Sequence, residues 1–189
     1  MHSRIGQYYH PTLVLADSPI SSICVTSSYG SCDMTNPSFG QNNSEILQLL
    51  HSGQVLMVNS RRRNGLIIYK GFHAEFAGPG ATVGGFYDRD CIAALPVGNL
   101  SLITPESHEE RQKAYLIRRQ WIRLMKQITE KPSPVQRVHK IMEQFEQYFD
   151  SETIARMPDE AFAQLIGVLP QTVRTVRKAS GNLDRRARF

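Results

Sequence analysis

Side chains suited to contacting the bases and phosphates of nucleic acid cluster within a short stretch of the chain. They are Gln171, Thr172, Arg174, Thr175, Arg177 and Lys178. Glutamine can pair with adenine, arginine with guanine, and threonine with a phosphate or a thymine methyl group. Val173 and Val176 interrupt the run at a spacing of three, which on a helix turns both valines to one face. The pattern predicts a helix whose outward face is cationic and rich in hydrogen-bond donors.

A helix of this kind needs a second helix to hold it, and the preceding residues meet the steric demands of that arrangement. Ala163 is small at the point where two helices would cross, and Phe162 would belong to their inner face. Gly167 can adopt the left-handed backbone of a tight turn, and Pro170 suits the first position of the next helix. The segment from Pro158 to Lys178 is therefore predicted to form a helix-turn-helix. An ordinary helical hairpin with a glycine turn is the alternative.

From Pro105 onward, apolar residues recur at the alternating spacing of three and four that is typical of a narrow helical seam. These residues are Ala114, Ile117, Trp121, Leu124 and Ile128. We interpret the seam as a dimer interface, and packing within one chain is the alternative. Lys131 to Pro134 ends this helix and starts another, with Ser133 placed to cap it.

Before these helices, the residues from Val55 to Ile103 form short apolar or β-branched runs separated by glycine and proline. This texture is typical of a small antiparallel barrel or sandwich. A helix from Ser44 to His51, with Ser44 as its N-cap, is expected to precede it. One strand is expected near Leu13 or Ile23.

Together these patterns predict an α+β fold with four parts. Residues 1–43 are expected to be a partly ordered segment, 44–104 an antiparallel β-roll or barrel, 105–131 a dimerisation helix and 132–189 a helix-turn-helix domain. The net charge of +5 resides in the second half, because residues 101–189 carry 16 Lys and Arg against 11 Asp and Glu. A basic C-terminal half indicates a polyanionic partner.

Other classes of function find no support in the sequence. The six histidines and three cysteines lack ligand spacing, and no catalytic arrangement is flanked by a recognisable motif, so no metal, cofactor or catalytic residue is expected. No apolar run approaches the roughly 18 residues of a membrane span, and no secretory signal is evident. We therefore expect a cytoplasmic protein that is not an enzyme.

The stretch from Phe162 to Lys178 resembles the helix-turn-helix of the Crp/Fnr transcription regulators, with Gln164, Gly167, Thr172, Val173 and Lys178 matching common choices there. The order of parts is also similar. The resemblance implies a β-roll from Val55 to Ile103, a dimer helix from Glu109 to Glu130 and a DNA-binding domain from Pro134 to Lys178. It also implies double-stranded DNA and a second copy of the chain as partners, with RNA polymerase as a further candidate.

The chain departs from that family in two places, so it resembles a divergent member. The cyclic-nucleotide cassette is not preserved, because Gly85 stands where its acid should follow Gly84, and Arg89 is only loosely placed. The residues after Lys178 are too few for a full wing hairpin. Arg185, Arg186 and Arg188 could grip phosphate in its place, or form a solvated end.

The sequence thus predicts a homodimeric, sequence-specific DNA-binding transcription regulator. A non-catalytic module that uses the same helices to bind a protein, with the β-roll as a scaffold, is the alternative. A small-ligand sensor or enzyme would be favoured by a polar, enclosed pocket lined from Ile67 to Leu95. The basic turn Arg61–Arg63 is interpreted as a solvated hairpin tip, with phosphate contact as its alternative.

Overall fold

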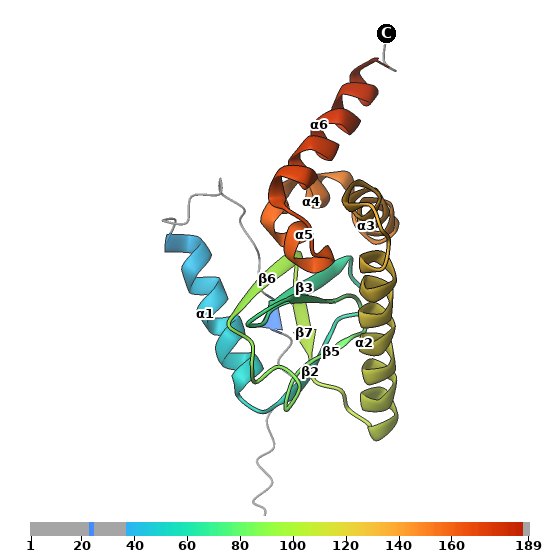
Figure 1. The fold of residues 1–189 in the computed structure, drawn as a ribbon. Coiled ribbons are helices and arrows are strands. Elements are labelled where there is room, and N and C mark those ends of the chain that lie inside the picture. Colours follow the sequence, from blue (N-terminus) through green and yellow to red (C-terminus); the bar gives the residue numbers. More distant parts are fainter. Residues whose placement is uncertain (1–22, 25–36, 187–189) are drawn as a thin grey trace, which may run out of the picture.

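The chain has an α+β architecture in which two antiparallel sheets precede a region made only of helices (Figure 1). The computed structural model describes residues 23–24 and 37–186, with side chains described from 44 to 180. Its strands are β1 (Ile23–Cys24), β2 (Val55–Val58), β3 (Asn64–Tyr69), β4 (Ala74–Ala77), β5 (Thr82–Gly84), β6 (Ala93–Gly98) and β7 (Ser101–Ile103). Its helices are α1 (Pro37–His51), α2 (His108–Thr129), α3 (Pro134–Tyr148), α4 (Ser151–Arg156), α5 (Asp159–Ile166) and α6 (Pro170–Arg186).

The strands lie where the glycine- and proline-bounded runs predict them, but they do not close into a barrel. One sheet has the order β1-β7-β2-β5 and the other β4-β3-β6, and all pairs are antiparallel. The expectation of a closed barrel is therefore wrong. Because β2 and β3 belong to different sheets, the turn Arg61–Arg63 connects the sheets and is not the tip of a hairpin.

The N-terminal expectations are met in part. β1 at Ile23 is the expected strand, whereas Leu13 and most of the first 36 residues lie outside the described part of the chain. Helix α1 begins at Pro37, so Ser44 lies inside it and is not its N-cap. Its residues Ile46 and Leu50 are fully buried, because the helix packs against β5 and β6.

The two long sides of the sheets are covered by different helices, α1 on one side and α2 on the other (Figure 1). Phe76 of β4 joins the sheets to the helical region. Its ring centroid lies 5.0 Å from that of Trp121 in α2, 4.8 Å from that of Phe145 in α3 and 5.9 Å from that of Phe149. Aromatic contacts of this kind stabilise a core beyond the area that they bury.

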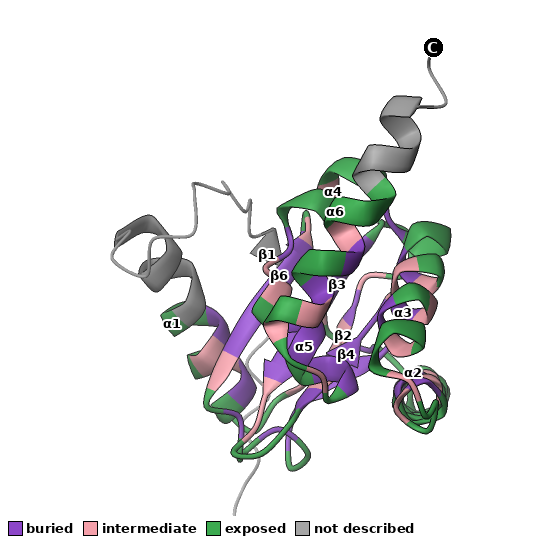
Figure 2. Ribbon diagram, turned by 45° about the horizontal axis from the view of Figure 1, so that its top comes forward, coloured by how far each residue is buried: buried purple, intermediate pink, exposed green. Residues whose placement is uncertain are grey.

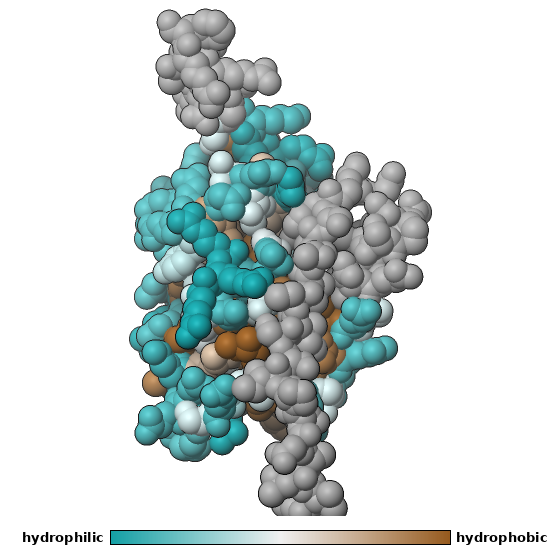
Figure 3. Space-filling model, turned by 180° about the vertical axis from the view of Figure 1, so that it is seen from behind, coloured by the Kyte–Doolittle hydropathy of each residue, from teal (hydrophilic) through white to brown (hydrophobic). Residues whose placement is uncertain are grey.

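The buried residues form one hydrophobic cluster that extends from Ile46 to Val176. They occupy the strands and the inner faces of the helices (Figure 2). The expected boundaries at residues 104 and 131 therefore fall within a shared core. Seen from behind, the described surface is mainly hydrophilic, and apolar side chains gather in smaller areas (Figure 3). Within the described ranges, no helix has the length and apolar character needed to span a bilayer.

Candidate nucleic-acid interface

The turn between α5 and α6 has the backbone that the sequence predicts. Gly167 caps α5 with φ 62° and ψ 51°, which is the left-handed conformation. The next N–H, that of Val168, donates to the carbonyl of Ala163 at 3.0 Å. Such a cap satisfies carbonyls left free at a helix end and favours glycine, since other residues are strained there. Helix α6 then begins at Pro170.

Small and apolar side chains hold the two helices together. Phe162 and Val173 are fully buried, and Ala163 and Val176 nearly so. From α3, the Arg137 guanidinium donates from Nε to the carbonyl of Lys131 and from Nη1 to that of Gly167. The pair α5–α6 therefore consists of two packed helices joined by a tight left-handed turn, and Arg137 fastens that turn to α3.

Substituting Gly167 with alanine should destabilise this corner by about 1–2 kcal/mol, the usual cost of a left-handed backbone for a residue with a Cβ. The effect is conformational, because an added Cβ would meet only Arg137 Nη1, at 4.0 Å. Urea denaturation measures the change. Gly71→Ala is the matched control, since Gly71 has open space around it and is not among the glycines with positive φ. Equal stability of the two variants would contradict the role of the turn.

Four of the expected contact residues lie on the outward side of α6. Gln171, Arg174, Thr175 and Lys178 are exposed, and Thr172 is half-buried. The Arg174 side chain is 56% exposed and forms a 3.4 Å ion pair with Asp159 at the start of α5. Exposed pairs of this kind contribute little, so the guanidinium can exchange this partner for another anion.

Arg177 was expected to face outward with them, and this prediction is wrong. Its Nη1 donates to the carbonyl of Met157 at 2.8 Å and to Asp159 Oδ1 at 2.9 Å, and its Nη2 donates to the carbonyl of Ile154 at 2.7 Å. Its guanidinium also lies 4.9 Å from the ring centroid of Phe162. Arg177 therefore satisfies carbonyls at the end of α4 and joins α4, α5 and α6.

The structure describes the basic residues after Lys178 only in part. Arg185 and Arg186 belong to α6, which continues through the residues expected to form a separate tail. Their side chains, and Arg188 altogether, lie outside the described residues. Among the described residues no strand follows α6, so no wing is seen there.

The buried side of α2 packs against the rest of the chain, because the helix contacts β4, β5, α3 and α5. Ala114, Trp121 and Ile128 are buried within the single chain, which agrees with the alternative of packing within one chain. Ile117 and Leu124 are half-buried. They line a shallow groove of about 290 Å³ between α2, α3 and the β4–β5 turn. The other residues of this groove are Pro79, Gln120, Trp121 and Tyr148. The same helix exposes Tyr115, Leu116 and Ile122 to solvent.

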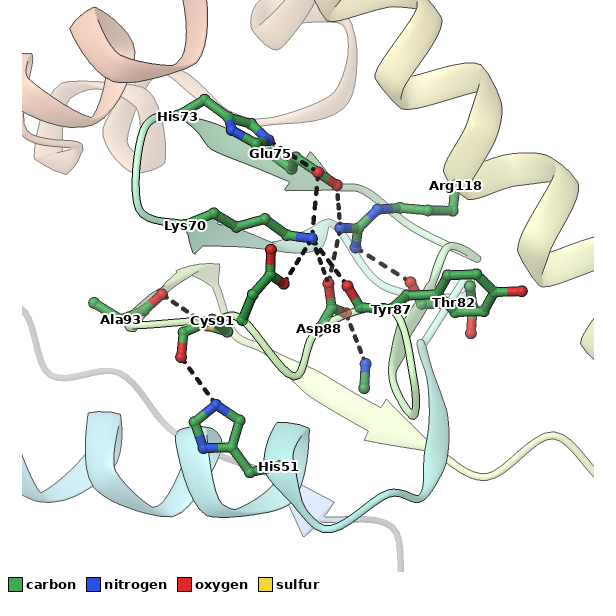
Figure 4. Close-up of polar contacts among 12 residues, drawn as sticks. His51, Lys70, His73, Glu75, Thr82, Tyr87, Asp88, Cys91, Ala93 and Arg118 are labelled. Atoms are coloured by element: carbon green, nitrogen blue, oxygen red, sulfur yellow. Dashed lines mark hydrogen bonds and ion pairs between the residues drawn. The ribbon is translucent and has the colours of Figure 1, made fainter.

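A buried charged cluster between the sheets and α2 has no counterpart in the sequence-based expectations (Figure 4). Arg118 of α2 donates from Nη2 to Glu75 Oε2 at 2.6 Å and to Asp88 Oδ1 at 3.2 Å, and from Nη1 to the carbonyl of Thr82 at 3.3 Å. Lys70 Nζ lies 3.5 Å from Glu75 Oε1 and 3.0 Å from Asp90 Oδ1. The cluster thus ties β3, β4, the β5–β6 loop and α2 together.

Burial and pairing act against each other on the acids of this cluster. Burial is the largest influence on Asp88 and raises its pKa, although Arg118 and the N–H of Gly84 favour its charged form. Burial would also raise the pKa of Glu75. There, the charge and hydrogen bond of Arg118, with help from His73 and Lys70, outweigh it and lower the pKa. Buried ions are costly unless paired, so each member depends on the others.

Lys70, Glu75 and Asp88 of this cluster belong to the segment from Ile67 to Leu95, in which a polar, enclosed pocket would have favoured a ligand sensor. Lys70, Glu75 and Asp88 are directed at one another and at Arg118, so their polar atoms are satisfied within the chain (Figure 4). The geometry gives positive support to an outward-facing surface on α6 and none to a ligand site at this place.

The structure thus defines an α+β protein with a C-terminal helical region, in which a tight turn joins α5 and α6. Comparison of the chain with protein-family models, with curated proteins and with solved structures returned no match.

Proposed function

We propose that this protein is a sequence-specific DNA-binding transcription regulator, with α6 as the helix that enters the major groove. The observation that carries the proposal is the division of α6 into two faces. Val173 and Val176 are buried against α5, while Gln171, Arg174, Thr175 and Lys178 face solvent. A recognition helix needs this division, because its inner face fixes its angle and its outer face contacts base edges.

The proposal includes action as a homodimer in the cytoplasm. Helix α2 leaves Tyr115, Leu116 and Ile122 exposed. Tyr115 and Ile122 are seven residues apart and so lie on one side of the helix, which is apolar surface that a second copy could cover. Two copies related by a two-fold axis would place their α6 helices in successive major grooves about 34 Å apart. The preferred DNA site would then be an inverted repeat.

Selection from a pool of random duplexes, followed by sequencing of the bound fraction, tests the proposal. We expect the full-length protein to enrich one motif with two half-sites about one helical turn apart. Gln171→Ala and Arg174→Ala should each relax the choice of base at one position of each half-site. Each loss should cost about 1–3 kcal/mol of discrimination, the worth of one bidentate base contact.

The matched control is Arg89→Ala, which removes one exposed positive charge from the β5–β6 loop. It should keep the motif and lower affinity only slightly, because it tests charge without touching α6. Enrichment of no motif by the folded wild-type protein at low salt would refute the proposal. An unchanged motif in both α6 variants would refute the role of this helix.

A further inference from the structure

The turn between β2 and β3 presents three consecutive arginines to solvent. Arg61, Arg62 and Arg63 are all exposed, and none forms an ion pair with another residue in the described part of the chain. Lys70, Arg118, Arg174 and Arg177, in contrast, each have a carboxylate partner. Three adjacent unpaired guanidinium groups repel one another, so the turn favours a polyanion as its partner.

The backbone of this turn is held firmly in place. Asn59 Oδ1 accepts from the N–H of Arg61 at 3.0 Å, and the Asn59 carbonyl accepts from Asn64 Nδ2 at 3.0 Å. Asn64 is fully buried. On the other side, a Cβ on Gly98 would lie 2.6 Å from the carbonyl oxygen of Arg63, so the strands approach closely. Binding of an anion would therefore order the three side chains without having to order the loop.

The turn lies beside the helices that lead into α6. Gly65, two residues after Arg63, packs against the ring of Phe76, and that ring contacts Phe149 at the end of α3. Asp150 follows, and its carboxylate accepts from the N–H of Thr153 and so caps α4. The hydrogen bonds from Thr153 lower the pKa of Asp150 most, and the charge of Arg63 also contributes.

Helix α4 begins just after Phe149, whose ring contacts Phe76. At its other end, Arg177 of α6 binds the carbonyls of Ile154 and Met157. Six residues of helix span about 9 Å at 1.5 Å per residue. A duplex carries one negative charge for about every 1.7 Å of its axis, so DNA that extends past α6 offers several phosphates over such a distance.

We propose that Arg61, Arg62 and Arg63 form a second phosphate-binding surface, which holds the backbone of the duplex that α6 contacts. This inference rests on the function proposed for α6. The turn contributes affinity and salt dependence but no choice of sequence, because phosphates are the same at every base pair. The turn would contact phosphates beside the base pairs that α6 contacts.

The test is the salt dependence of DNA binding by the full-length variant R61Q/R62Q/R63Q. Fluorescence anisotropy gives the affinity for the selected duplex and for a random duplex across a series of salt concentrations. Each lost phosphate contact lowers the magnitude of the slope of log K against log salt by about 0.9, so we expect a fall of about 2 to 3 for each bound copy of the chain and of about 5 for a dimer. The ratio of specific to random affinity should stay unchanged, and so should thermal unfolding.

A control variant with the same loss of charge is R89Q/K131Q/K140Q, in which three solvent-accessible cations outside α2, α6 and the arginine turn are replaced. It should leave the slope near the wild-type value. A turn variant with the wild-type slope, or a control that lowers the slope equally, would overturn the inference while α6 still selects its motif. If the wild type selects no motif, the function proposed for α6 fails. Even in that case, a salt-dependence slope on random duplex that is smaller in magnitude for the turn variant than for the wild type would show that the turn contacts phosphates.

Discussion

Replacing Arg118 with alanine should lower the free energy of unfolding by about 3–5 kcal/mol, the usual result of breaking a buried ion pair by removing one partner. Arg118 is only 5% exposed, and its loss leaves Asp88 and Glu75 without their closest cation. Lys70 remains, but its ammonium lies farther from both carboxylates, at 3.9 and 3.5 Å. Urea denaturation followed by circular dichroism measures the change.

Two further variants separate charge from packing. Arg119→Ala removes the exposed neighbour of Arg118 and should change stability by no more than about 0.5 kcal/mol. Arg118→Met keeps apolar volume but no charge, and it should remain strongly destabilised at neutral pH. If Arg118→Ala costs less than about 1 kcal/mol, the cluster does not hold α2 to the sheets.

The pH dependence of the Arg118→Met variant follows from the same cluster. In the wild type the lowered pKa of Glu75 stabilises the fold above the ordinary pKa of about 4.3, and this contribution is lost as the pH falls through the folded-state value. Without Arg118 the buried carboxylates favour their neutral form, so acid relieves the variant. The stability gap between the two proteins should therefore narrow as the pH falls from about 7 towards 4.

Phe76→Ala should be about as severe, with a loss of about 3–5 kcal/mol for a fully buried phenylalanine. The ring is the contact between β4, α2 and α3, so its removal should weaken the sheets and the helical region together. Trp121 is the only tryptophan of the chain and packs against Phe76, so its fluorescence reports on the junction. Circular dichroism reports on the helices.

We expect both signals to change in one transition with the same midpoint, in the wild type and in Phe76→Ala, because the core is shared. Phe72→Ala provides the control, since Phe72 is fully exposed in the β3–β4 turn and should contribute little. Two separate midpoints would mean that the sheets and the helices unfold independently, and that Phe76 does not couple them.

Local signals in the sequence predicted much of this fold. Gly167 and Pro170 marked the turn and the start of α6, because backbone conformation at such positions depends mainly on the residue itself. The strands between Val55 and Ile103 were bounded by glycines and prolines for the same reason. Helix spacing also found the apolar side of α2, although not the surface that this side contacts.

The remaining features depend on contacts between distant segments. From the sequence alone, Arg118 is expected to be a solvent-exposed helix residue. Its partners Glu75 and Asp88 are 43 and 30 residues away in the sequence, so only the folded structure places them next to it. The division of the strands into two sheets likewise depends on which strands pair, and strands far apart in the sequence can be partners. Arg177 is different, because a signal was present. It lies four residues after the buried Val173 and therefore on the same side of the helix.

The junction at Phe76 also limits how this protein could be divided or recombined. A gene segment encoding only residues 132–189 would carry α6 and its outward side chains, but it would leave behind the ring on which Phe145 and Phe149 rest. Natural shuffling and laboratory grafting both favour units that bring their own interior. In this chain the sheets and the helices share theirs, so they are best inherited, exchanged and expressed as one piece.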